Sequence, residues 1–273
     1  EEEKKRIKQL KSFVNKHFKE MEISHFERLF DKIDDSLKGQ FNLQYRMHPD
    51  INEVIKQFYI TDGGLECGLI SPIDLGVDDP DMTNSASRFH GIEIDDFISK
   101  DNHVIWIETN SPELLDGTSR INYGEVDAIR GILTKFQQSE SFQSYQSTWK
   151  NPEDQQIGLI SFYGKQIKLL TNLGKEFKDI PIRVSTVDRF QGMERNIIIV
   201  SMVRSNRIAA DPKQKPDINL YGELGFPEQK DLGFAKSPNR LNVALSRAKR
   251  LLIIVGNSEL FRQKEIYNNV YNT

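Results

Sequence analysis

The sequence has almost no cysteine and no long hydrophobic run. Its one cysteine among 273 residues, Cys67, cannot form an internal disulfide framework, and no cluster of Cys and His residues has the spacing of a metal site. No apolar run approaches the ~20 residues that a membrane-spanning helix needs. These absences exclude a disulfide scaffold and predict a chain without a metal site or a membrane span. We expect a reducing, intracellular location, in the cytoplasm or in the nucleoid or nucleus.

The amino terminus has neither an initiating methionine nor a signal-peptide pattern. The chain opens with EEEKKRIKQL, which is charged and lacks the apolar stretch of a targeting segment. With 37% hydrophobic and 28% charged residues, the chain is long enough to bury a substantial core. We therefore expect a globular piece of a longer protein.

The net charge of −3 is unevenly distributed along the chain and argues against a uniformly basic nucleic-acid binder. Residues 71–101 contain eight acidic and two basic residues, a net charge of −6, whereas residues 182–207 contain five arginines and two acidic residues, a net charge of +3. We expect residues 70–101 to form an acidic, solvated loop or insertion, with partner binding as the alternative. The arginine-rich segment is either solvated surface or part of a site.

Helical and strand patterns alternate along the chain. Residues 1–38 have apolar positions at helical spacing, and helices are also expected over 51–59, 123–136 and 165–177. Continuous apolar runs are typical of strands that are buried on both faces, and they occur at 103–109, 157–163, 182–188, 196–204 and 251–257. Residues 137–156 are expected to form a polar linker loop. The alternation predicts an α/β fold with a mainly parallel central sheet.

The loops that follow the expected strands are polar. They read SFYGKQ, STVDRFQGMER and SMVRSN. Ligands of parallel sheets bind beyond the carboxyl ends of the strands, so these loops are the expected place for a site.

Three long stretches resemble motifs IV, V and VI of superfamily 1 helicases, in the group typified by the nonsense-mediated-decay helicase. They are LQYRMHP at 43–49, STVDRFQGMERNIIIVSMVRSN at 185–206, and RLNVALSRAKRLLIIVGN at 240–257. Two shorter stretches, SHFERLF and IGLISFYGKQ, resemble further segments of the same family. The resemblance implies a RecA-like, P-loop NTPase-type three-layer fold for residues 39–273. Residues 1–38 would then be a helical connection from a first RecA-like domain.

The phosphate-binding loop of such NTPases is absent from this chain. The sequence contains no Gly-x-x-x-x-Gly-Lys-Ser/Thr motif and no apolar strand that ends in a paired Asp-Glu. In the family these elements belong to the first RecA-like domain, and ATP binds in the cleft between the two domains. The resemblance therefore implies that ATP and Mg²⁺ are bound mainly through a missing first domain, and that this fragment alone is inactive.

The resemblance assigns nucleotide roles to several residues. Arg46 and Arg247 would be arginine fingers that stabilise the charge on the γ-phosphate, a task suited to a permanently charged, forked donor; for Arg46 the alternative is a surface ion pair. Tyr45 would stack on the purine, with a half-buried core tyrosine as the alternative. His48 and Pro49 are expected to shape the turn rather than to act as acid or base.

Motif V is expected to contact both ligands of the domain. The resemblance implies that Gly192 allows close approach of phosphate to the backbone, that Gln191 orients the terminal phosphate or a water, and that Glu194 binds ribose hydroxyls. Asp188 is placed to couple the nucleotide site with the nucleic-acid site. Asn196 stands where the family usually carries Asp.

The expected contacts to single-stranded nucleic acid lie at strand ends, where hydroxyl groups can hold phosphates without reading sequence. The candidates are Ser161, Tyr163, Ser185 and Thr186. Ser161 has an alternative role as a cap of the following helix, and Phe162 replaces the proline that is usual in the family.

The resemblance thus implies the second motor domain of an ATP-dependent superfamily 1 DNA or RNA helicase that moves along a single strand with 5′ to 3′ polarity. The alternative is a non-catalytic module that binds nucleic acid or protein with a RecA-like fold, because fold alone does not determine function. A phosphate-binding loop in the upstream sequence would favour the helicase.

Overall fold

The structure is a computed structural model that describes residues 2–22, 25–39, 41–69, 76–151, 156–206 and 231–273. The chain divides into two compact units, Glu1–Phe41 and Asn42–Thr273. The first unit contains α1 (Glu2–Glu22), α2 (His25–Lys32) and a 3₁₀ turn at Asp35–Leu37. These are the helices that the apolar spacing predicted. No helix in the described ranges is long and apolar enough to span a membrane.

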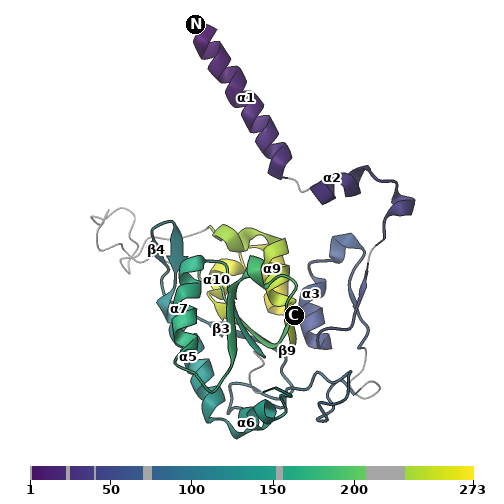
Figure 1. The fold of residues 1–273 in the computed structure, drawn as a ribbon, viewed down its shortest axis with the longest axis vertical. Helices are drawn as coiled ribbons and strands as arrows, with labels where there is room; N and C mark the ends of the chain where they lie inside the picture. Colours follow the sequence, from purple (N-terminus) through teal and green to yellow (C-terminus); the bar gives the residue numbers. More distant parts are fainter. Residues whose placement is uncertain (1, 23–24, 40, 70–75, 152–155, 207–230) are drawn as a thin grey trace. The chain divides into compact units, whose positions relative to one another are not determined.

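The second unit is built on a five-stranded sheet in which all neighbouring strands are parallel (Figure 1). The spatial order is β3-β9-β8-β6-β7. The strands are β3 (Val104–Glu108), β6 (Ile157–Ser161), β7 (Ile182–Thr186), β8 (Arg195–Ser201) and β9 (Ala248–Gly256). Each of the five predicted strands is present, and the predicted parallel α/β class is confirmed.

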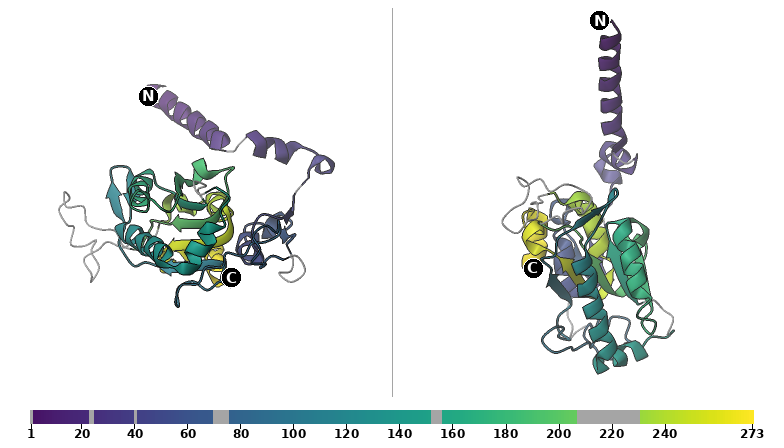
Figure 2. Two further views of the ribbon diagram at one scale, coloured as in Figure 1. Left: turned by 60° about the horizontal axis from the view of Figure 1, so that its bottom comes forward. Right: turned by 90° about the vertical axis from the view of Figure 1, so that its left-hand side faces the viewer.

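Helices cover both faces of this sheet and make three layers (Figure 1; Figure 2). Alternate residues of β8 explain why, because Ile197 and Ile199 belong to one core and Ile198 and Val200 to the other. The first core is covered by α5 (Tyr123–Gln138), α6 (Glu140–Ser147) and α7 (Gly164–Gly174). The second is covered by α3 (Pro49–Lys56), α9 (Pro238–Leu245), α10 (Ser258–Phe261) and α11 (Glu265–Asn272).

The predicted polar linker at 137–156 is wrong. Helix α5 continues to Gln138, and α6 follows at once, capped by the Ser139 side chain. Phe142, Tyr145 and Trp149 are buried, and their spacing of three and four residues puts them on one side of the segment. Only three apolar positions are needed to dock α6, so the surrounding Gln and Ser residues hid the helix. Residues 152–155 lie outside the described part.

The acidic segment is a loop as predicted, but its described part, 76–101, is not simply solvated. It contains no helix and no strand beyond an isolated bridge between Ile94 and Ile98. Val77, Ile92 and Ile98 are fully buried. The segment is therefore anchored to the core at several points, while Asp81, Glu93, Asp95 and Asp96 are exposed between them.

Small strand pairs complete the unit. Strands β1 (Leu43–Gln44) and β2 (Glu66–Cys67) pair in parallel, and β4 (Leu114–Asp116) and β5 (Ser119–Ile121) form an antiparallel hairpin. A short helix, α8 (Val187–Phe190), follows β7 directly. Strands β1 and β7 both lead into the loops that resemble helicase motifs.

A buried carboxyl group holds the end of β8. Glu125 of α5 accepts hydrogen bonds from the Ser201 hydroxyl at 2.6 Å and from the Val203 backbone N–H at 2.8 Å. Val203 has a φ of +69°, in the left-handed region that a β-branched residue rarely adopts. Next to it, the buried Arg204 donates to Glu113 at 2.7 Å. These contacts fix the SMVRSN loop against the sheet and stabilise a strained backbone.

We expect the stability of the chain to depend on pH through Glu125. Burial raises the pKa of the Glu125 carboxyl to about 8, against the hydrogen bonds from Ser201 and Val203 that lower it. Because this pKa is above the value of 4.5 for an exposed glutamate, the stabilisation is complete below pH 4.5 and is lost as the pH rises to 8. Relative to Glu125→Gln, the free energy of unfolding of the unmodified chain should fall by about 1.4 kcal/mol per pH unit across this window. Urea denaturation at several pH values measures the free energy of unfolding of both chains. If the two free energies changed with pH in the same way, the raised pKa of Glu125 would be contradicted.

Candidate functional site

Two arginines that are far apart in the sequence meet beside β9. Arg46 lies in the turn after β1, and Arg247 lies between α9 and β9. Arg46 Nη1 donates to the carbonyl oxygen of Ser246 at 3.2 Å, and Arg247 Nη2 donates to the Ser246 hydroxyl at 3.0 Å. The structure therefore brings together the two arginines predicted for the γ-phosphate.

Main-chain hydrogen bonds set this meeting point. The His48 N–H donates to the Lys249 carbonyl oxygen at 2.9 Å, which attaches the turn after β1 to β9. The Arg195 N–H donates to the Arg247 carbonyl oxygen at 2.9 Å, which attaches β8 to the residue before β9. Backbone contacts thus bring the main chains of Arg46 and Arg247 close together, and the side-chain contacts to Ser246 and Glu194 then place the guanidinium groups.

One carboxylate faces several cations at this point. Glu194 Oε2 lies 2.9 Å from Arg46 Nε, and Glu194 Oε1 forms a salt bridge with Lys249 Nζ. Partial burial opposes ionisation of Glu194, but the hydrogen bonds and charges of Lys249 and Arg46 outweigh it and lower its pKa. Burial and the charge of Arg46 lower the pKa of Arg247. Arg46, Arg247 and Lys249 therefore carry more positive charge than Glu194 neutralises, which favours an anion.

Tyr45 presents its ring to solvent directly beside Arg46. The residue is 60% exposed, so the alternative of a core tyrosine is wrong. One side of the ring lies over Gly68, where an added Cβ would come within 2.1 Å of Tyr45 Cε1. A planar, supported and exposed ring of this kind is suited to stack on a base.

The motif V turn leaves its backbone accessible. Gly192 has a φ of +82°, which favours glycine, and no heavy atom lies within 4 Å of the position that a Cβ would take. Gln191 is exposed beside it. The Met193 carbonyl oxygen accepts a hydrogen bond from Arg247 Nη1 at 3.4 Å. The turn that holds Gln191, Gly192 and Glu194 is therefore in direct contact with Arg247.

Asp188 forms an ion pair that links two motifs. Its Oδ1 atom lies 3.3 Å from Arg240 Nε, and Arg240 belongs to α9, whose other end leads to Arg247. Arg240 also lies over the Phe234 ring, with 5.2 Å from Cζ to the ring centroid. Asp188 thus connects the end of β7 with the helix that positions Arg247.

A family model described as an AAA domain matches residues 21–259. The chain belongs to this AAA domain family. The expected resemblance to helicases of the nonsense-mediated-decay group is confirmed by its relatives, and the chain is a helicase-family domain.

Relatives of this AAA domain are much longer proteins. The chain is 28% identical to a Regulator of nonsense transcripts 1 homolog from Drosophila melanogaster, over 85% of its own length and 16% of the relative. It is 30% identical to the DNA replication ATP-dependent helicase/nuclease dna2 from Schizosaccharomyces pombe over 92% of the chain and 16% of the relative. An uncharacterized ATP-dependent helicase from Methanocaldococcus jannaschii is 29% identical over 96% of the chain and 33% of the relative. The chain thus spans about a sixth of the first two relatives.

The hydroxyl groups predicted to bind nucleic acid are mostly buried in the AAA domain. Ser161, Tyr163 and Ser185 are all buried, and Thr186 is half-buried. The Tyr163 hydroxyl accepts hydrogen bonds from Arg204 Nη1 and from the Phe234 N–H, both at 3.4 Å. No side chain caps α7, so the alternative of Ser161 as a helix cap is wrong as well. Of the four predicted side chains, only Thr186 offers exposed surface.

His48 shapes the turn of the AAA domain as expected. Its Nδ1 atom accepts a hydrogen bond from the Asp50 N–H at 3.2 Å and so caps α3, while Nε2 lies 3.0 Å from Asp78 Oδ1. The rings of His48 and His103 are stacked, with centroids 3.3 Å apart and planes within 7°. This packing buries His48 under the turn that carries Tyr45 and Arg46.

His48, His103 and Asp78 are close enough to suggest a metal site, but their geometry does not fit one. An ion bound to a histidine lies near the plane of its ring, and two stacked parallel rings share no such position. Because His48 Nδ1 accepts the Asp50 N–H, the proton lies on Nε2, which must then donate to Asp78. The cluster is therefore a hydrogen-bonded support for the turn.

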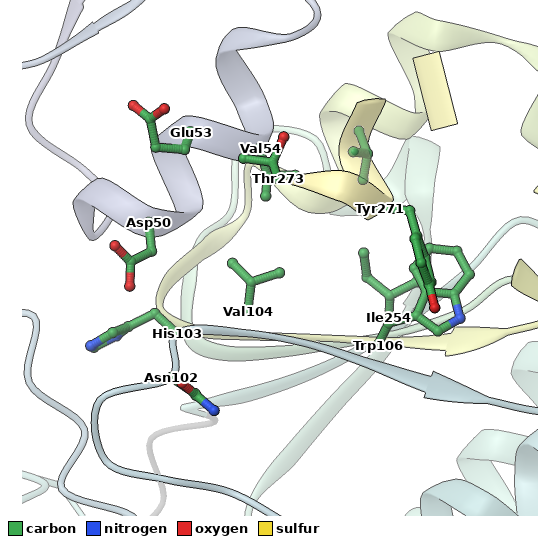
Figure 3. A pocket seen from close by; sticks show the side chains of 11 residues that line it. Asp50, Glu53, Val54, Asn102, His103, Val104, Trp106, Ile254, Tyr271 and Thr273 are labelled. Atoms are coloured by element: carbon green, nitrogen blue, oxygen red, sulfur yellow. The ribbon is translucent and has the colours of Figure 1, made fainter. Parts of the chain in front are cut away.

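A pocket lies next to this support and away from the two arginines. It has a volume of about 350 Å³ and lies between α3, the start of β3 and α11. Figure 3 shows Asp50 and Glu53 on α3 at one side of it and Trp106 with Tyr271 at the other. None of the residues predicted for nucleotide or nucleic acid lines this pocket.

Sequence reasoning missed three residues of the site: Lys249, Arg240 and Arg88. Lys249 and Arg240 lie inside the motif VI stretch, so their positions beside Arg247 could have been noticed. Arg88 lies in the acidic segment, and its Nη2 and Nε atoms donate to the carbonyl oxygens of Tyr45 and Arg46. No sequence signal indicated that contact.

The His48 cap predicts acid sensitivity. Burial lowers the pKa of His48 to about 3, with further lowering by the charges of His103 and Arg88. The stabilisation is therefore present above pH 6.5, the ordinary value, and is lost as the pH falls toward 3. His48→Asn keeps a cap but removes the titration. Relative to this variant, the unmodified chain should lose about 1.4 kcal/mol of unfolding free energy per pH unit below pH 6.5.

Urea denaturation between pH 7 and pH 4 checks this expectation. His25→Asn is the matched control, because His25 is exposed in the first unit. Its unfolding curve should follow the unmodified chain at every pH. A His48→Asn chain with the same acid sensitivity as the unmodified chain would contradict the role of His48.

Proposed function

We propose that this AAA domain is the second motor domain of an ATP-dependent superfamily 1 helicase, and that it supplies Arg46 and Arg247 to the γ-phosphate of ATP. The observation that carries the proposal is the convergence of both arginines on Ser246 and Glu194. Arg46 and Arg247 come from opposite ends of the unit, and their positive charges repel each other. Their meeting at one exposed point therefore indicates that an anionic ligand binds there.

The chemistry of phosphoryl transfer supports the pairing of two arginines. The transition state spreads negative charge over the equatorial oxygens of the γ-phosphate, and arginines supplied from a second domain stabilise it by ~10³ to 10⁵ in rate in related NTPases. Arg46 now donates to Glu194, and phosphate oxygens would compete for the same donors. Lys249 would keep Glu194 neutralised when Arg46 moves to the phosphate.

The remaining nucleotide contacts follow from exposure and position. Tyr45 would stack on the purine, because its ring is supported on one side and exposed. Gln191 and the open backbone at Gly192 would face the phosphates, and Glu194 would reach the ribose. ATP and Mg²⁺ would be held mainly by a first RecA-like domain, since this chain has no phosphate-binding loop.

We propose that single-stranded DNA or RNA runs along the carboxyl edge of the sheet. Thr186 would contribute a hydroxyl contact, and the main chain after β6 and β7 would replace the buried side chains of Ser161, Tyr163 and Ser185 as phosphate partners. Asp188 would transmit the nucleotide state, because its ion pair with Arg240 connects this edge to α9. Such an enzyme would act inside the cell, where both its ligands are present.

The proposal predicts the behaviour of arginine variants. In the full-length protein, Arg46→Ala and Arg247→Ala should each lower the kcat of nucleic-acid-stimulated ATP hydrolysis by at least ~10²-fold, because each removes a donor that acts in the transition state. Arg183→Ala is the matched control, since Arg183 is exposed near the amino end of β7. The 273-residue chain alone should show little or no turnover.

Steady-state phosphate release measures these rates. Unchanged turnover in both arginine variants would refute the assignment of the two arginines. Robust turnover by the chain alone would refute the view that half of the site belongs to another domain. Full activity in Arg183→Ala shows that loss of an arginine as such is not the cause.

A further inference from the structure

Arg88 of the acidic segment binds the main chain of the two residues that present the candidate nucleotide groups. Its Nη2 atom donates to the Tyr45 carbonyl oxygen at 2.7 Å, and its Nε atom donates to the Arg46 carbonyl oxygen at 2.6 Å. Its Nη1 atom donates to the carbonyl oxygens of Ser85 and Ser87 at 3.0 and 2.8 Å. All these acceptors are carbonyl oxygens, so the guanidinium group serves to hold backbone.

Arg88 is itself held in place by buried neighbours. Its N–H donates to the Val77 carbonyl oxygen at 2.5 Å, and Val77 is fully buried. The hydroxyl of the fully buried Ser87 donates to the Asp79 carbonyl oxygen at 2.7 Å. The guanidinium group is therefore supported by a turn that is anchored in the core.

Gly68 supports the Tyr45 ring from the other direction. The Gly68 N–H donates to the Gln44 carbonyl oxygen at 2.7 Å, which continues the β1–β2 pairing up to Tyr45. An added Cβ at Gly68 would lie 2.1 to 2.6 Å from three atoms of the Tyr45 ring. The absence of a side chain at Gly68 therefore lets the ring lie in its present position.

We propose that Gly68 and Arg88 are positioning residues for the nucleotide, which set the Tyr45 ring and the Arg46 guanidinium group in one arrangement before ATP binds. This inference rests on the proposed function of Tyr45 and Arg46. Successive carbonyl oxygens held by one rigid, forked donor restrict the backbone between them, which determines where both side chains start. A turn of this kind, without helix or strand, would otherwise be ordered only on binding, which weakens affinity.

The two residues have distinct expected effects on catalysis in the full-length protein. Gly68→Ala displaces only the Tyr45 ring, so the KM for ATP should rise about fivefold to tenfold, in the range of a lost stacking contact, with kcat within about twofold. Arg88→Ala loosens Arg46 as well, so KM should rise and kcat should fall by ~10-fold or more, because small displacements of catalytic groups are costly. Lysine cannot hold two carbonyl oxygens in the same fork, so the KM and kcat of Arg88→Lys should lie between those of the unmodified protein and those of Arg88→Ala.

Matched controls and a double variant separate positioning from general damage. Gly131→Ala lies on α5 with nothing within 4 Å of the new Cβ, and Arg183→Ala removes an exposed arginine, so neither should change KM or kcat. Gly68→Ala should have no further effect on KM in a Tyr45→Ala background, because its action passes through that ring. An additive effect of Gly68→Ala and Tyr45→Ala would overturn the role of Gly68.

Amide hydrogen exchange of the 273-residue chain tests the positioning without relying on ATP hydrolysis. In Arg88→Ala, exchange of residues 45–48 should become at least ~10-fold faster, whereas exchange of the central strands β8 and β9 should be unchanged. Unchanged exchange at 45–48 would overturn the proposal. Faster exchange with unchanged KM and kcat would also overturn it, because the turn would then be held for a reason other than nucleotide binding.

Failure of the proposed function gives a different result. Unchanged turnover in both Arg46→Ala and Arg247→Ala would refute that function, whereas exchange at 45–48 would still respond to Arg88→Ala. The positioning role alone would be refuted by a different pair of results. Arg46→Ala and Arg247→Ala would lower kcat as expected, but Arg88→Ala would change neither exchange nor KM nor kcat.

Discussion

The geometry of the candidate site depends on one main-chain hydrogen bond, from the His48 N–H to the Lys249 carbonyl oxygen. It attaches the turn after β1 to β9, a central strand with β3 on one side and β8 on the other. Arg46 precedes the donor by two residues, and Arg247 precedes the acceptor by two residues. The bond therefore brings the main chains of the two arginines together, and His48, which caps α3 through the Asp50 N–H and is stacked on His103, keeps its donor in place.

The candidate site carries an excess of positive charge, which favours an anion. Glu194 is the carboxylate that pairs with both Arg46 and Lys249, and Arg247 lies beside them without a carboxylate of its own in the described contacts. Because these groups are partly exposed, their pairwise attractions are weak and can be exchanged for contacts to phosphate. Lys249 allows this exchange without leaving Glu194 unpaired. In the proposed function, the site would thus be preformed and would still release Arg46 to phosphate.

The sheet and the approximate place of the site could be predicted from sequence because both leave strong local signals. Continuous apolar runs such as Ile197 to Val200 identify buried strands, and their alternation with helices predicts parallel pairing. The convergence of Arg46 and Arg247 followed from the family resemblance and not from any pattern of spacing. Helix α6 was missed because three buried aromatic residues suffice to dock it among many polar ones.

Other features could not be predicted because they depend on distant contacts. A hydroxyl at a strand end can face a ligand or the core, and Ser161, Tyr163 and Ser185 face the core. A single arginine in an acidic loop is usually solvated, but Arg88 binds the carbonyl oxygens of Tyr45 and Arg46, which are more than forty positions away in the chain. The support of the motif IV turn comes from a segment that carries no motif itself.

The most direct test of the central claim is a structure of the full-length protein with ADP, aluminium fluoride, Mg²⁺ and a single strand, a mimic of the γ-phosphate in transfer. We predict that the guanidinium groups of Arg46 and Arg247 both donate to the fluoride atoms, with Lys249 still paired to Glu194. A complex in which the two arginines keep only their contacts to Glu194 and Ser246 would contradict the account.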